Sequence, residues 1–173
     1  MSSSDSNPLC FECGLCCNGV IFADGQLEPG DNVDRLKQLG LRLIAASKRS
    51  TAGPKFRQPC SAFRNCRCEI YSDRPKYCRE FECLLLKSVS SGKTDRKSAL
   101  RIVQLARKQS DTVNRLLGEL GESDVSTALG ARFRRVKRRL ENGIADNETA
   151  DRFAQLSLAV HELNLLLREA FVP

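Results

Sequence analysis

Cys10-Phe11-Glu12-Cys13-Gly14-Leu15-Cys16-Cys17 places four thiols within eight residues. The two-residue gaps between Cys10, Cys13 and Cys16 allow three sulfurs to converge on one centre, as in the cysteine runs that hold iron–sulfur clusters and the knuckles that hold zinc. Cys17 leaves the backbone in a different direction from Cys16, so the two thiolates rarely serve one tetrahedral ion. The stretch predicts a metal-binding module in which Cys17 closes a larger cluster or belongs to a second site.

The other cysteines return after a long gap, and all nine lie in the first half of the chain. We expect a loop over residues 48–59, rich in Ser, Gly, Pro and basic residues, that lets this second set fold back onto the first. Ser72 or Asp73 can cap a short helix with Pro75 in its first turn, so one of Cys78 and Cys83 should lie beyond the end of that helix. The five returning cysteines are Cys60, Cys66, Cys68, Cys78 and Cys83.

Composition favours metal ligation over disulfide bonding. The chain has 173 residues, enough for one compact domain or a small domain with a helical extension, and its 6% aromatic content leaves few large core anchors. Residues 1–8 carry neither the basic nor the apolar segment of a secretory signal, so we expect a cytoplasmic protein with reduced thiols. No apolar run approaches the roughly 20 residues that span a membrane. The formal charge of +7 is compatible with acidic partners but identifies none.

The second half is predicted to be helical and to pack as a three-helix bundle or hairpin extension. Apolar residues recur at helical spacing from Thr94 or Asp95 to Gly121, from Ser123 to Asn142, and from Asn147 almost to the end. We therefore predict a mainly α protein in three parts: a disordered lead-in (1–9), an irregular cysteine-cluster metal-binding module (10–92) and a cysteine-free helical region (93–173). A protein partner is expected to dock on that helical region. A further helix is expected from Asp31 or Asn32 towards Ile44.

The cysteine pattern also resembles a known family. Ile70-Tyr71, Arg74-Pro75 and Cys78-Arg79 fall in order with eight of the thiols over residues 10–83, as in the YkgJ-type cysteine-cluster proteins, which carry a zinc- or iron-chelating domain. Cys66 lies outside the pattern, and a plain free thiol is its simplest interpretation. The resemblance implies a pool of metal ligands made up of Cys10, Cys13, Cys16, Cys17, Cys60, Cys68, Cys78 and Cys83.

Several functional hypotheses follow. The metal centre is an iron–sulfur cluster or zinc, with iron–sulfur slightly favoured, and Arg74 and Arg79 are expected to flank it. The related flagellin lysine-N-methylases pair a similar cysteine set with S-adenosylmethionine, which suggests as an alternative an iron–sulfur enzyme or enzyme accessory. This chain, however, shows no Gly-rich methyltransferase loop and no catalytic constellation. A weaker alternative is a zinc-stabilised nucleic-acid-binding protein that uses the basic run 132–139. His161, the only histidine, is expected to be a partly buried structural residue.

Overall fold

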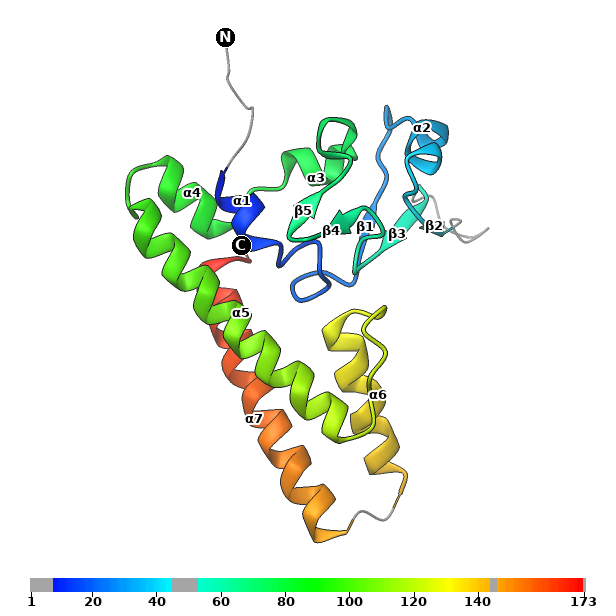
Figure 1. The fold of residues 1–173 in the computed structure, drawn as a ribbon, viewed down its shortest axis with the longest axis vertical. Coiled ribbons are helices and arrows are strands. Elements are labelled where there is room, and N and C mark those ends of the chain that lie inside the picture. Colours follow the sequence, from blue (N-terminus) through cyan, green and yellow to red (C-terminus); the bar gives the residue numbers. More distant parts are fainter. Residues whose placement is uncertain (1–7, 45–52, 144–145, 173) are drawn as a thin grey trace.

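The chain is mainly α-helical, as the sequence predicts. The computed structural model describes residues 8–44, 53–143 and 146–172. The helices are α1 (Pro8–Cys13), α2 (Val33–Gln38), a 3-10 turn η1 (Tyr71–Asp73), α3 (Lys76–Glu80), α4 (Leu84–Ser90), α5 (Arg96–Glu119), α6 (Leu129–Glu141) and α7 (Asn147–Ala170). The strands are β1 (Asp24–Gln26), β2 (Leu43–Ile44), β3 (Lys55–Arg57), β4 (Phe63–Arg64) and β5 (Arg67–Cys68). Figure 1 shows the short elements gathered at one end and the long helices extending away from them.

A small antiparallel sheet supports the far side of the cysteine region. Its strand order is β1-β3-β2, with Phe56 of β3 opposite Gly25 and Leu43. Phe56 is 1% exposed, and a Cβ on Gly25 would lie 2.3 Å from the ring atom Cζ, so glycine is needed where the ring crosses β1. The expected helix towards Ile44 is wrong in its second half. Asn32 caps α2 as predicted, but Gly40 at φ +84° turns the chain, and the residues after it pair with β3.

Strands β4 and β5 form a hairpin with a two-residue turn. Both turn residues, Asn65 and Cys66, have positive φ (48° and 60°). Two positive φ values define the type I′ turn, whose twist matches that of the flanking strands. The hairpin therefore projects Cys66 at its tip and carries Cys68 on its second strand.

Helices α5 and α7 run antiparallel along most of their length, and α6 packs beside them (Figure 1). Asp95 caps α5 by accepting from the backbone N–H of Ser98 at 3.0 Å, as the sequence predicts. Asp146 caps α7 by accepting from the Thr149 N–H at 2.8 Å, one residue before the expected Asn147. These caps set the start of both long helices, and the predicted three-helix arrangement is confirmed in outline.

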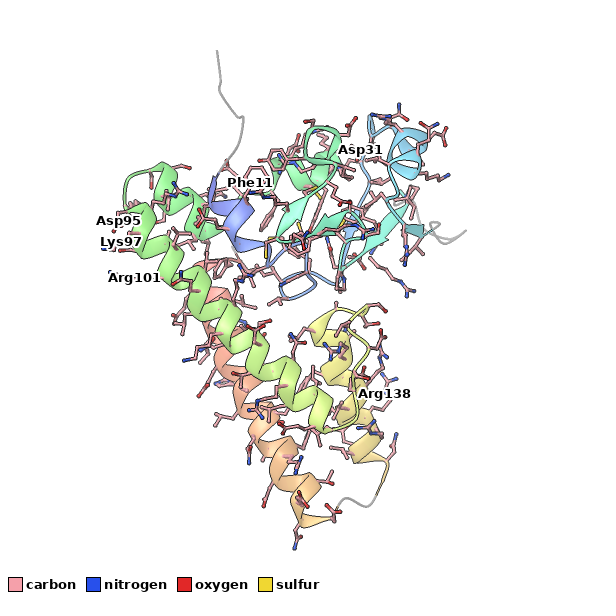
Figure 2. All side chains as sticks on the ribbon, viewed as in Figure 1. Phe11, Asp31, Asp95, Lys97, Arg101 and Arg138 are labelled. Carbon is pink, nitrogen blue, oxygen red and sulfur yellow. The ribbon has the colours of Figure 1, made fainter. Side chains whose placement is uncertain are left out.

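Helix α6 starts later than expected and buries part of its basic run. The Asp124 carboxylate accepts from the backbone N–H of Ser126 and the hydroxyl of Thr127, so residues 123–127 form a turn instead of the predicted first helical turn. Arg132 of the basic run 132–139 is only 3% exposed, and it donates to Asn114 Oδ1 at 2.6 Å and to the Glu122 carbonyl at 2.8 Å. Arg138 projects outward from the helix (Figure 2). Arg132, the first residue of the basic run, thus has a structural role.

One hydrophobic core joins the cysteine region to the long helices. Leu9 and Leu15 pack in the same cluster as Val103 of α5 and Leu163 of α7. The Leu84 N–H also donates to the carbonyl of Phe171 at 3.3 Å, which joins the end of α7 to the start of α4. Of the expected lead-in, residues 1–7 lie outside the described residues, while Leu9 is buried.

Two further expectations concern the surface. His161 is exposed on α7, so the prediction of a partly buried histidine is wrong. None of the helices in the described part of the chain is long and apolar enough to cross a membrane.

Candidate metal centre

All nine cysteines, each within the described residues, line a single cavity of about 120 Å³ and form no disulfide. They come from α1 and the turn after it, from the β4–β5 hairpin and its approach, from α3, and from the start of α4. Most of the remaining lining is apolar and includes Phe56, Ile70 and Phe171. The fold thus brings the two cysteine-rich stretches of the sequence together, as the predicted return of the chain requires.

The first cysteine stretch is shaped by a helix end and a close approach. Cys10 and Cys13 lie on α1, which ends at Gly14 with φ +68°. A Cβ on Gly14 would lie 2.5 Å from Cζ of Phe63, so only glycine lets β4 approach the end of α1 this closely. The backbone N–H of Cys60 donates to the carbonyl of Cys17 at 2.8 Å, which joins the two cysteine stretches.

Helices α3 and α4 place the last two thiols. Cys78 lies on α3, whereas Cys83 lies beyond that helix and caps α4, its Sγ accepting from the Leu86 N–H at 3.4 Å. This confirms that one of the two cysteines leaves the short helix. The predicted cap is wrong, because Ser72 and Asp73 lie in η1 and Pro75 stands at the N-cap of α3. The N-terminus of α3 is held from a distance, because the Asp31 carboxylate accepts from the Lys76 N–H at 2.8 Å.

The thiols influence one another in two groups of four, and the first group contains the ferredoxin-like run. Burial is the main cause of the raised pKa of the Cys16 thiol. Nearby thiols raise this pKa further, in the order Cys13, Cys17, Cys83 and Cys10. Burial also raises the pKa of Cys13 to about 12, with Cys83 and Cys10 adding to the rise. Cys10 is an exposed residue, but its sulfur is largely shielded from solvent. This burial is the main cause of its raised pKa, and Cys83 raises the pKa further. We call Cys10, Cys13, Cys16 and Cys83 the first thiol group.

The second group gathers around Cys17. Burial raises the pKa of the Cys17 thiol, and the next contributions come from Cys60, Cys78 and Cys68, with a smaller one from Cys10. Burial raises the pKa of Cys78 to about 12, again with Cys60 and Cys68 adding to it. We call Cys17, Cys60, Cys68 and Cys78 the second thiol group. Cys17 also raises the pKa of its neighbour Cys16, so the two groups adjoin at these consecutive residues.

Arg74 lies close to both groups. Burial raises the pKa of the Cys10, Cys68 and Cys78 thiols, and the positive charge of Arg74 opposes that rise at all three. Its guanidinium carbon lies 3.6 Å from the centre of the Tyr71 ring, and its Nε donates to the Tyr71 carbonyl at 3.0 Å. Arg79 was also expected to flank the metal centre, but it does not line the cavity. It donates to the Arg74 carbonyl and approaches Asp31 at 4.0 Å.

The thiols line the cavity but are not gathered around a single metal position. Within residues 8–44, 53–143 and 146–172, no three His, Cys, Asp or Glu side chains are arranged as a ready metal site. The cavity also contains an unsatisfied polar atom, because Gln58 is 6% exposed and its Oε1 has no hydrogen-bond partner. Cysteine thiolates are the donors that soft metals prefer. Together with a buried amide oxygen that has no hydrogen-bond partner, they are compatible with a metal centre in this cavity.

Comparison with known proteins gives one match, to a family model named CxxCxxCC and described as "Putative zinc- or iron-chelating domain", over residues 9–108. The matched segment is more than half of the chain. The protein belongs to the CxxCxxCC family. No curated protein and no solved structure matches the chain.

The CxxCxxCC segment extends beyond Cys83, the last cysteine of the pattern, and includes the first half of α5, residues 96–108. There Arg107 donates from Nη1 to the carbonyl of Glu12 at 2.9 Å and from Nη2 to the sulfur of Cys66 at 3.0 Å. Cys66 is thus hydrogen-bonded at the hairpin tip and contributes to neither thiol group. The family boundary coincides with the part of α5 that contacts the cysteine region.

Several residues that shape the CxxCxxCC cavity were missed by sequence reasoning. Asp31 was interpreted as a turn or cap residue. It has that local role, because it accepts from the Glu28 N–H at 2.9 Å, but it also accepts from the N–H of the distant Lys76 at 2.8 Å. Gln58 and Arg107 carried no sequence signal beyond their closeness to a cysteine or a helix. The role of the eight predicted cysteines as metal ligands stays a prediction.

Proposed function

We propose that this protein binds metal in two adjacent centres, each held by four cysteine thiolates. The observation that carries the proposal is the separation of the eight family-pattern thiols into the first and second thiol groups. Four sulfurs are the number that a tetrahedral zinc ion or a four-iron cluster requires. Two such sets also account for the adjacent cysteines Cys16 and Cys17, which would then serve different centres.

The donor set favours soft metals. Neither group contains the protein's histidine, which lies on α7, and thiolate-only sites are typical of zinc and iron–sulfur clusters. Ligation needs deprotonated sulfur, and the buried thiols hold their protons strongly, so metal uptake releases protons. Arg74 supports the thiolate forms of both groups by its charge.

For the first thiol group we favour an iron–sulfur cluster. Its three closely spaced cysteines on α1 and the following turn, joined by the remote Cys83, have the three-plus-one arrangement of ferredoxin clusters. Such a cluster supplies one-electron redox chemistry when bound. The second thiol group draws on four separate segments, an arrangement that suits a closed structural zinc ion as well as a cluster.

The first test is metal and acid-labile sulfide analysis of protein purified without oxygen, with a visible absorption spectrum. Iron and sulfide in near equal amounts, with a brown colour, support a cluster. Zinc without sulfide would overturn the iron–sulfur assignment but keep the two centres. Protein that retains neither zinc nor iron after anaerobic purification and reconstitution would refute the proposal.

The second test addresses the partition. Cys13→Ser should remove the metal of the first group only, and Cys60→Ser that of the second group only. Cys66→Ser is the matched control, because its sulfur lies in the same cavity but in neither group, and it should leave the metal content unchanged. Equal loss of all metal from both ligand variants would instead indicate one shared centre.

A further inference from the structure

Helix α7 has one apolar stripe that the fold covers, and two further leucines on the opposite side that it leaves exposed. Phe153, Leu156, Leu163 and Leu167 face the core, where Phe133 of α6 stacks on Phe153 at a centroid distance of 6.1 Å. Leu158 and Leu165 lie on the opposite side and are 59% and 47% exposed. Burying such exposed leucines against a partner is favourable. The outer side of α7, however, lacks a partner within the described residues.

The outer stripe has the spacing of a coiled-coil seam. Its positions follow one another at alternating steps of three and four, and each is exposed. At 3.6 residues per turn they lie about 150° around the helix from the core-facing stripe, so α5 and α6 do not obstruct them. The outer stripe consists of Asp151, Ala154, Leu158, His161, Leu165 and Arg168.

The two ends of the stripe carry opposite charges. Asp151 and Arg168 are exposed, and neither forms an ion pair with another described residue. In a parallel pairing of two copies, like charges would face each other at both ends and destabilise the pair. In an antiparallel pairing with the two-fold axis between Leu158 and His161, Asp151 of each copy faces Arg168 of the other. Leu158 then faces His161, and Ala154 faces Leu165, so a small side chain meets a large one.

We propose that α7 is a self-association surface, on which a second copy of this chain docks in antiparallel orientation along the outer stripe. The contact offers two leucines and one alanine from each copy, which is less apolar area than stable interfaces bury and is typical of transient contacts. We therefore expect a weak, reversible dimer that forms at high protein concentration. The proposal does not depend on which metal the cysteines bind.

Sedimentation velocity of the full, metal-loaded chain over a wide concentration range tests the proposal. The wild-type protein should show a monomer–dimer equilibrium. Leu158→Glu places a charge at the centre of both symmetry-related contacts and should raise the dissociation constant at least about tenfold. Leu105→Glu is the matched control, since Leu105 is 48% exposed on α5, and it should leave the equilibrium unchanged.

A charge exchange tests the register. Asp151→Arg and Arg168→Asp should each weaken the dimer, and the double variant should restore it, because the pair is re-formed in reversed order. Circular dichroism checks that the variants keep their helices. A wild-type chain that stays monomeric, a dimer insensitive to Leu158→Glu, or a double variant without rescue would each overturn the proposal. Binding of a different protein to α7 of a monomeric chain would also do so.

Discussion

The carboxylate of Asp31 accepts a hydrogen bond from the backbone N–H of Lys76 at 2.8 Å, across 45 positions of sequence. It accepts a second from the Glu28 N–H, and its side chain is only 2% exposed. The first N–H groups of a helix have no partner within the helix. Here the carboxylate of the distant Asp31 accepts from one of them, and its negative charge is favourable at a helix N-terminus. Asp31 thereby fixes the start of α3, the helix that carries Cys78.

Asp31→Ala should lower the free energy of unfolding by about 2 kcal/mol, because it removes charge-assisted hydrogen bonds in a buried place. The metal of the second thiol group should also be released more readily to a chelator, since Cys78 loses its support. Denaturant unfolding and chelator competition measure the two effects. Asp34→Ala is the control, because the Asp34 side chain is 89% exposed, and it should change neither quantity. Equal effects of the two variants would contradict the assigned role.

Gly14→Ala should disrupt the contact between α1 and β4. The added Cβ would lie 2.5 Å from Cζ of Phe63, in addition to the strain of a side chain at φ +68°. Gly92→Ala separates the two causes, because Gly92 has φ +72° and no neighbouring atom within 4 Å. We expect Gly92→Ala to cost about 1 kcal/mol from backbone strain alone. Gly14→Ala should cost clearly more and reduce metal retention by the first thiol group, as measured by unfolding and metal analysis.

Arg74→Leu should weaken metal binding at both thiol groups. The substitution removes the positive charge that opposes the rise in the pKa of the Cys10, Cys68 and Cys78 thiols, and it leaves a shorter, uncharged side chain beside Tyr71. Competition with a chromophoric chelator at constant pH measures the loss. Arg79→Leu is the control, since its guanidinium contacts Asp31 and the Arg74 carbonyl instead. Loss at only one group would mean that Arg74 serves that group alone.

The metal-free protein should lose stability at alkaline pH. Burial raises the pKa of the Cys13 and Cys78 thiols from 9.0 to about 12. Above pH 9 the unfolded chain ionises these thiols while the folded chain keeps them protonated, so the folded state binds more protons. Stability is therefore intact below pH 9 and falls as the pH rises towards 12. The metal-loaded protein, whose thiolates are already ionised, should lack this fall when both forms are compared by thermal unfolding.

The sequence predicted well where local signals and tertiary packing agree. The long helices α5 and α7 have uninterrupted apolar periodicity and start at aspartate caps, so they were found almost to the residue. It failed where one side chain redirects the backbone. Asp124 holds residues 123–127 in a turn before α6, and Gly40 stops α2, although both segments keep apolar residues at helical spacing.

The sequence predicted that the two cysteine-rich stretches come together, but not how the thiols group. Their close spacing indicated a common site, and their role as metal ligands stays a prediction. Which sulfur faces which depends on contacts between distant segments, such as the hydrogen bond from Cys60 to Cys17. No periodicity or motif encodes such a contact. For the same reason Gln58 and Arg107 had no signal, and the outward orientation of His161 follows only from where α5 packs on α7.

Phe171 forms part of the cavity wall but is synthesised long after the last cysteine. Its side chain is 1% exposed and lines the cavity with the thiols, although it follows the last cysteine by most of the helical region. At ribosomal rates of about 5–20 residues per second, the segment from Cys83 to Phe171 takes on the order of ten seconds to make. During that interval every cysteine has been synthesised and the cavity lacks one wall. Metal donors and oxidants thus reach the thiols of the nascent chain more easily than those of the finished protein.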